Sequence, residues 1–148
     1  MTLKSKKNNF KPKQRARRFA MQAIYQWHLT HENFSAIQAK FLAQEEMVSV
    51  DTAYFVLLVQ GVLKEQTSLD SHLQQCLDRP LKELDLVELA ILRLGAYELL
   101  ECAEVPYKVA LNESIELAKM FGATDSYKYI NGILDLLAKK NRPLEYKD

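Results

Sequence analysis

Three arginines lie within four positions near the start of the chain, directly before an apolar and aromatic stretch. At about 100° per residue, a helix through this stretch places basic, amide and aromatic side chains on one face. These side chains are Arg15, Arg18, Gln22 and Tyr25. Arginine binds phosphate oxygens, glutamine can hydrogen-bond to base edges, and a tyrosine ring can stack on a base. The pattern indicates a single-stranded RNA site, and a solvated helix face is the alternative.

The distribution of charge favours nucleic acid at this end of the chain. Residues 1–31 contain eight Lys or Arg and no acidic residue, whereas residues 32–148 contain 12 basic and 19 acidic side chains. A basic end on an acidic body indicates a polyanionic partner at one end and a basic partner elsewhere. A mitochondrial transit peptide is the alternative, and it is disfavoured because Phe19, Ile24 and Trp27 have the spacing of a permanent core.

The elements that must hold this site are helices. Only four glycines and four prolines occur, good helix formers are frequent, and no segment alternates as a strand does. We expect residues 1–12 to be a flexible basic arm and residues 13–148 to be a single helical domain with about seven helices. Arg79–Pro80 is the clearest break, so two small packed bundles are predicted over about 13–79 and 80–140.

The leucine-rich segment 81–102 is apolar around nearly its whole circumference. Such a helix is usually the buried centre of a bundle. Its charged residues, Glu88 and Arg93 among them, must therefore lie in an ion pair, at a gap in the packing or at a binding surface. For each of them taken alone, the ion pair is the favoured interpretation.

Three glycines fall inside predicted helices. Gly61 costs helix stability unless a neighbouring helix needs a close approach there, and Gly132 is interpreted as a packing glycine. Gly95 lies on the same face as Glu88 two turns later, which leaves room for an approaching partner.

The last predicted helix begins within the segment GATDSYKYINGILD. Its first turn contains Lys128 and Tyr129, which could contact a phosphate and stack on a base. A surface lysine and an edge tyrosine are an equally good interpretation of the spacing. Asp125 is explained by helix capping without any function.

No arrangement of catalytic residues occurs in the sequence. It contains no glycine-rich phosphate loop, no metal-ligand spacing and no Gly-x-Ser-x-Gly elbow. Cys76 and Cys102 are isolated, as expected for thiols in a reducing cytoplasm, and no apolar run is long enough to span a membrane. We therefore expect a protein that is not an enzyme and that uses neither a metal nor a cofactor.

Four segments resemble, in this order and spacing, the signature segments of the NusB family of bacterial transcription antitermination factors. They are ARRFAMQAIYQW, LRLGAYEL, VPYKVALNESIELAKMFG and DSYKYINGILD. The resemblance implies an all-α fold of two small packed helical bundles, in a cytoplasmic bacterial protein without catalytic activity. It also implies that the protein binds boxA-type single-stranded RNA with NusE, a small-subunit ribosomal protein. The RNA polymerase antitermination complex, notably on ribosomal RNA operons, is the implied setting.

The resemblance also assigns roles to individual positions. Those that match the family's RNA-binding residues are Arg15, Arg17, Arg18, Tyr25, Arg93, Asp125, Lys128 and Tyr129. The basic arm and the helix face add Lys13 and Gln22 to this set, and Glu88 matches an acid on the family's NusE-facing surface. Tyr127 and Tyr129 stand where histidine and phenylalanine are expected, so aromatic stacking is retained.

Two other functions stay open. The acidic body would allow the protein to act mainly as an interaction scaffold for a basic ribosomal protein, with incidental RNA contact. A NusB-like domain also forms the RNA-binding part of certain ribosomal RNA cytosine methyltransferases. This chain ends at Asp148 without a cofactor-binding domain, so the stand-alone factor is preferred.

Overall fold

The computed structural model describes the backbone of residues 2–146 and the side chains of residues 10–146. Within this part of the chain the elements are helices and no strand occurs, which confirms the predicted all-α class. The chain forms two compact units, Met1–Gln60 and Gly61–Asp148. The division lies inside a single helix, α3 (Thr52–Lys64).

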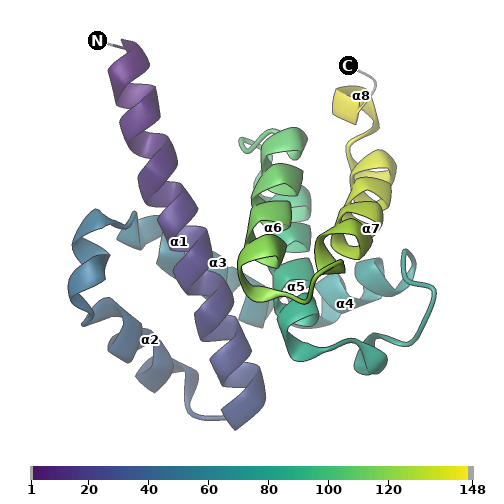
Figure 1. Cartoon of the computed structure of the whole chain (residues 1–148), viewed down its shortest axis with the longest axis horizontal. Coiled ribbons are helices and arrows are strands. Elements are labelled where there is room, and N and C mark those ends of the chain that lie inside the picture. Colours follow the sequence, from purple (N-terminus) through teal and green to yellow (C-terminus); the bar gives the residue numbers. More distant parts are fainter. Residues whose placement is uncertain (1, 147–148) are drawn as a thin grey trace. The chain divides into compact units, whose positions relative to one another are not determined.

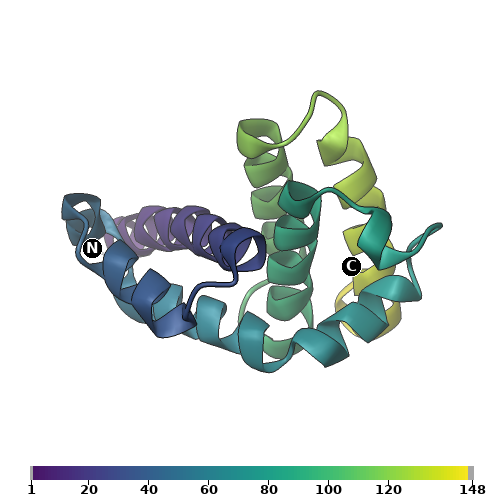
Figure 2. The same ribbon diagram turned by 90° about the horizontal axis from the view of Figure 1, so that it is seen from below.

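The first unit contains α1 (Thr2–Thr30), α2 (Phe34–Leu42), the 3₁₀ helix η1 (Glu45–Ser49) and most of α3. Figure 2 shows α2 running alongside α1. The helix α1 begins well before Gln14, where the sequence predicts it, and its backbone stays helical through Pro12. That residues 1–12 form a flexible arm stays a prediction, and the side chains of residues 1–9 lie outside the described part of the chain.

The core of the first unit is an apolar stripe on α1 that faces α2 and α3. Its fully buried members recur at helical spacing and are Ala16, Ala20, Ala23 and Ile24. The Phe41 ring of α2 connects the three helices, because its centroid lies 6.1 Å from that of Phe19 and 6.1 Å from that of Phe55. The predicted core face of α1 therefore does pack inward.

Polar side chains determine where α2 and α3 begin. The Asn33 side chain caps α2, because it accepts a hydrogen bond from the backbone N–H of Ser35 at 2.9 Å. The Asp51 carboxylate accepts one from the backbone N–H of Tyr54 at 3.0 Å. Because the Asp51 N–H donates to the Pro12 carbonyl at 3.1 Å, the start of α3 is tied to α1.

The second unit is built around α5 (Leu86–Glu101). Three helices pack against it, namely α4 (Gln66–Gln74), α6 (Tyr107–Phe121) and α7 (Ser126–Asn141). The short elements of this unit are η2 (Leu81–Glu83) and α8 (Pro143–Tyr146). Figure 1 shows α6 and α7 side by side next to α5. Every residue of α5 from Leu89 to Leu99 is buried, as expected for a central helix.

The two units divide earlier in the chain than the seam predicted at Arg79–Pro80. Pro80 does follow the end of a helical segment, but α4 before it packs on α5 and α7. The helix α4 therefore belongs to the second unit. A proline marks a break in backbone direction and gives no information about which neighbours a helix packs against.

The three helical glycines differ in what surrounds them. A Cβ at Gly61 would overlap the Tyr97 ring, so the expected close approach is confirmed. At Gly95 a Cβ would lie 2.6 Å from Leu134 and 2.7 Å from Ser114, and the expected room for a partner is wrong because these side chains fill it. No atom lies within 4 Å of a Cβ placed on Gly132, so its predicted packing role is also wrong.

The connection between α5 and α6 is held by two residues from much later in the chain. The buried guanidinium of Arg142 donates to the backbone carbonyls of Glu98, Leu99, Cys102 and Val105. The Glu145 carboxylate accepts from Arg142 at 3.1 Å and from the backbone N–H of Tyr107 at 2.6 Å. One ion pair thus satisfies carbonyls at the end of α5 and an amide at the start of α6.

Candidate nucleic-acid interface

Two basic residues of α1 lie against the ring of Tyr54, which belongs to α3. The Lys13 amine is 5.2 Å and the Arg17 guanidinium 5.4 Å from the ring centroid, within the range of a cation–π interaction. The two cations are four residues apart, so both project from the same side of α1. Arg17 is only 3% exposed. The RNA contact predicted for Arg17 is therefore corrected to a packing role, whereas Lys13 is partly exposed.

Arg15 lies beside a groove between α1 and η1. Its Nη1 donates to the Ser49 carbonyl at 3.3 Å, which fixes the side chain next to η1. The groove has a volume of about 340 Å³ and is lined by Lys11, Pro12, Arg15, Val48, Ser49 and Val50. Its two cations can bind phosphate oxygens, and Val48, which is 96% exposed, offers an apolar contact to a ribose or base.

Arg18, Gln22 and Tyr25 follow Arg15 along α1, and each is partly exposed. The Gln22 amide donates to the Arg18 backbone carbonyl at 3.2 Å. The residues predicted from the helix face thus do lie together on α1. The α1 basic surface is defined here as Lys11, Lys13, Arg15 and Arg18. These are the partly or fully exposed cations of α1 between residues 11 and 18.

Arg93 on α5 makes a bidentate ion pair with Asp70 on α4. Its Nε and Nη2 each donate to one carboxylate oxygen at 2.9 Å. The Arg93 side chain is 4% exposed and that of Asp70 26% exposed. The ion-pair interpretation of this charge is confirmed. Because a carboxylate already occupies its guanidinium, the RNA contact that the resemblance implies for Arg93 is corrected to a structural role that joins two helices.

Three elements of the second unit meet around Tyr129. Its hydroxyl donates to the Asp78 carboxylate at 3.2 Å, and the Arg79 guanidinium lies 4.9 Å from its ring centroid. Asp78 and Arg79 are themselves paired at 2.9 Å. Burial, followed by the hydrogen bond to Asp78, raises the pKa of Tyr129 above its ordinary value. The Tyr129 surface is defined here as Asp78, Arg79, Glu88, Ser126 and Tyr129.

Glu88 enters this surface from the first turn of α5. Burial is the main cause that raises the pKa of its carboxyl, while a hydrogen bond with Ser126 opposes the shift. The charge of Arg79 also stabilises the ionised form of Glu88. The predicted partner-binding acid and the predicted RNA-binding tyrosine therefore lie on one surface of the second unit.

Asp125 and Lys128 lie in the first turn of α7 and are exposed. Asp125 is the N-cap residue, as predicted, but its side chain makes no capping hydrogen bond. Its carboxylate instead lies 3.6 Å from the Lys128 amine. Exposed pairs of this kind contribute little to stability, so both groups stay available to a ligand.

Sequence reasoning missed Tyr54, Asp78 and Arg79. The spacing of Lys13 and Arg17 shows that they share one side of α1, but nothing near them indicates that a tyrosine from α3 lies there. An adjacent Asp–Arg pair before a proline is typical of a surface turn, and only the fold places it beside α7.

The described residues contain no candidate metal site, no disulfide and no membrane-spanning helix. Their His, Cys, Asp and Glu side chains form no group of three that could hold a metal ion. Cys76 and Cys102 are both buried thiols outside any disulfide. No helix in the described part of the chain is long and apolar enough to cross a membrane.

Comparisons with known proteins give a consistent result. Residues 14–139 match the model of the NusB family. The "Transcription antitermination protein NusB" of Idiomarina loihiensis is 52% identical over 88% of this chain and 94% of its own length. The protein of the same name from Alcanivorax borkumensis is 53% identical over 90% of this chain and 89% of its own length.

Solved structures agree with this result. The structure "T. maritima NusB" has a TM-score of 0.80 and 29% identity, and covers 92% of this chain and 96% of that one. The NusB and NusE factors in complex with dsRNA include a chain with a TM-score of 0.75 and 23% identity, which covers 86% of this chain and 96% of that one. The latter likeness concerns the fold.

Proposed function

Because the chain belongs to the NusB family, we propose that it is a transcription antitermination factor that binds boxA-type single-stranded RNA together with NusE. The observation that carries this proposal is the close similarity, over about nine tenths of the chain, to proteins named as transcription antitermination factors. Its proposed place is the bacterial cytoplasm, where transcription occurs, and its proposed role is binding without catalysis.

The α1 basic surface supports the RNA part of the proposal. Its four cations lie on one helix, and two of them, Lys11 and Arg15, line a groove that a phosphate and ribose can enter. Arg17 and Tyr54 support this surface from beneath, because the Tyr54 ring contacts both Arg17 and Lys13. Held cations bind phosphate at a smaller entropic cost than mobile ones.

The Tyr129 surface supports the protein part of the proposal. It combines an aromatic ring, the partly buried carboxylate of Glu88 and an Asp–Arg pair. A basic ribosomal protein can pair with the acids of this surface, and the Tyr129 ring stays a predicted stacking surface for an RNA base.

The first test replaces both Arg15 and Arg18 by alanine. Affinity of the mixture with NusE for boxA RNA should fall about tenfold or more, since each guanidinium can make charge-assisted hydrogen bonds to a phosphate. The slope of log affinity against log salt should decrease by about 0.7 for each phosphate of the single strand that the variant leaves unneutralised. Filter binding at several salt concentrations measures both quantities.

The matched control replaces Lys139 and Lys140, two exposed lysines in the last turn of α7. It removes the same charge and should leave the salt slope unchanged. An Arg15/Arg18 variant that keeps the wild-type affinity and slope rejects the α1 basic surface as the RNA site. A collapsed circular-dichroism melt would instead mean that Arg15 acts through its bond to Ser49.

The second test concerns Glu88 and pH. Because burial raises the pKa of this carboxyl, Glu88 loses its charge at a higher pH than an ordinary glutamate as the solution is acidified. Affinity for NusE should therefore decrease from neutral pH toward pH 5. A Glu88→Gln variant should bind more weakly at neutral pH and show less of this decrease, as measured by calorimetric titration.

Unfolding is not the cause expected for that decrease. A carboxyl whose pKa is raised in the folded protein stabilises the fold below its unfolded pKa, and this contribution is lost as the pH rises. The Glu88 contribution to stability therefore increases where the affinity decreases. Equal affinity and equal pH dependence of the Glu88→Gln variant and the wild type would remove Glu88 from the NusE interface.

A scaffold function is the second candidate, and the acidic body favours it. Residues 32–148 contain 19 acidic against 12 basic side chains, which suits a basic ribosomal protein. A pull-down with NusE, with and without boxA RNA, separates the two functions. The RNA-binding proposal expects boxA RNA to increase recovery of the complex more than a scrambled RNA does, whereas a scaffold recovers equal amounts.

A further inference from the structure

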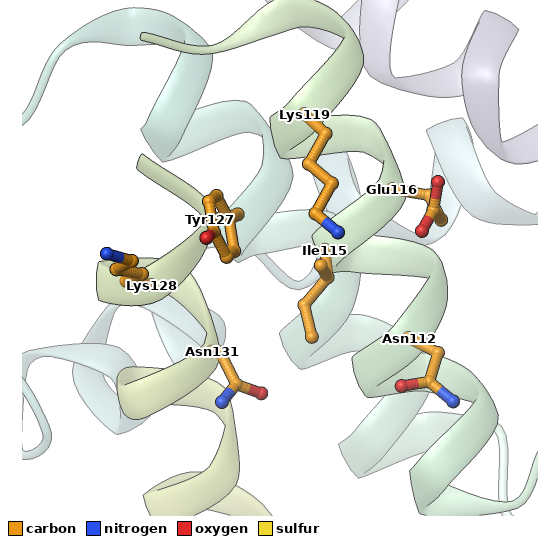
Figure 3. Close-up of a pocket in the computed structure, with 7 residues that line it drawn as sticks. All are labelled: Asn112, Ile115, Glu116, Lys119, Tyr127, Lys128 and Asn131. Carbon is orange, nitrogen blue, oxygen red and sulfur yellow. The ribbon is translucent and has the colours of Figure 1, made fainter. Parts of the chain in front are cut away.

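A groove of about 430 Å³ lies between α6 and α7 in the second unit. It is lined by Asn112, Ile115, Glu116, Lys119, Tyr127, Lys128 and Asn131. Figure 3 shows Tyr127 and Asn131 on α7 toward Ile115 on α6, with the Lys119 amine between Tyr127 and Glu116, and with Lys128 on the far side of the Tyr127 ring. Of these side chains, only Lys128 belongs to the predicted RNA-binding residues.

Tyr127 forms the aromatic side of this groove. The Lys119 amine lies 5.0 Å and the Lys128 amine 5.9 Å from its ring centroid. Two ammonium groups are thus gathered around one ring, and the Lys119 amine is directed into the groove (Figure 3). Ile115 adds an apolar surface beside them.

The remaining side chains can form hydrogen bonds with a base. Asn112 and Asn131 each offer both a donor and an acceptor, and both are exposed. Glu116 offers acceptors only and suits an exocyclic amino group. Glu116 would repel a phosphate and Lys119 would attract it. These two charges therefore orient a nucleotide in the groove, with its phosphate at Lys119.

We propose that this groove binds one nucleotide of single-stranded RNA, with the base against Ile115 and the carboxamides and the phosphate at Lys119. The proposal rests on the RNA-binding function proposed above and adds a nucleotide subsite to it. Lys128 lines the groove and also belongs to the first turn of α7, next to Tyr129, so the subsite continues the predicted RNA-binding residues of this unit. Glu116 favours cytosine, adenine or guanine over uracil, because uracil has no exocyclic amino group.

The first experiment titrates the full chain with nucleoside monophosphates and, separately, with inorganic phosphate. Side-chain amide signals of Asn112 and Asn131 are followed by nuclear magnetic resonance. Saturable shifts with cytidine monophosphate, and smaller ones with uridine monophosphate or phosphate alone, are expected. Equal shifts with inorganic phosphate, or none with any nucleotide, would overturn the subsite.

The second experiment measures binding of boxA RNA in the presence of NusE. Tyr127→Ala should weaken binding about tenfold, because it removes the ring around which the Lys119 and Lys128 amines are gathered. Asn131→Ala, an exposed substitution, should weaken it less and leave folding intact. The control is Lys108→Ala, which removes an exposed lysine from the other end of α6.

Failure of the subsite and failure of the proposed function give different results. If the wild type binds boxA RNA and both groove variants bind it equally well, the subsite is rejected and the function stands. If the wild type does not discriminate boxA from scrambled RNA, the function is rejected, and the mononucleotide titration still decides whether the groove binds a nucleotide.

Discussion

Replacing Arg142 by alanine is expected to lower the free energy of unfolding by about 3–5 kcal/mol, the cost typical of breaking a buried ion pair. The Arg142 side chain is 8% exposed and donates to four backbone carbonyls as well as to Glu145. Without it, the Leu99 and Val105 carbonyls lose their side-chain donor, the Glu98 and Cys102 carbonyls keep only their backbone donors, and Glu145 keeps a charge without its partner. Urea denaturation followed by circular dichroism measures the change.

Two comparisons isolate the role of the guanidinium. Arg142→Lys keeps the charge but cannot reach several carbonyls at once, so it should recover only a minor part of the loss. Arg79→Ala removes an arginine from an exposed ion pair and should change stability far less than Arg142→Ala does. If Arg142→Ala is no more destabilising than Arg79→Ala, the Arg142 bonds do not hold the α5–α6 connection.

Gly61→Ala is expected to destabilise the protein by about 2 kcal/mol, because overpacking of about 3 kcal/mol outweighs a gain of about 1 kcal/mol in helix propensity. The added methyl group would overlap two ring carbons and the hydroxyl oxygen of Tyr97, and Tyr97 is buried. The ring can move only by displacing its neighbours. Thermal and urea unfolding of the variant measure the effect.

Gly132→Ala is the matched control, since this glycine also lies inside a helix. Its Cβ would meet no atom within 4 Å, so only the propensity gain remains, and stability should rise by about 0.5–1 kcal/mol. In a double-mutant cycle, Tyr97→Leu should reduce the cost of Gly61→Ala. Destabilisation of similar size at both glycines would contradict a specific contact between Gly61 and Tyr97.

Periodicity in the sequence was enough to predict the elements that pack by an apolar face. Ile24 of α1, one of the residues with the predicted core spacing, is buried, and the leucine-rich α5 is the centre of its unit. These features depend on neighbours within a few turns, and such neighbours can be inferred from the sequence.

Arginine roles could not be predicted in the same way. Arg15, Arg17 and Arg18 have the same chemistry, but Arg17 packs on Tyr54 while Arg15 and Arg18 stay partly exposed. Arg93 likewise has its partner, Asp70, on another helix. Whether a guanidinium is available to RNA depends on residues that are distant in the sequence. A family resemblance therefore assigns arginines to an RNA site that the fold keeps buried.

The α5–α6 connection also has a consequence for the order in which the chain is made. During translation, the end of α5 and the start of α6 leave the ribosome before Arg142 and Glu145, which bind them. Until those two residues emerge, this connection has only its local backbone bonds, from Cys102 to Glu98 and from Val105 to Cys102, and the Tyr107 amide lacks the Glu145 carboxylate. The nascent second unit therefore gains its full stability late in synthesis, and a ribosome stalled before residue 142 holds a chain whose central helix lacks the Arg142 bonds at its end.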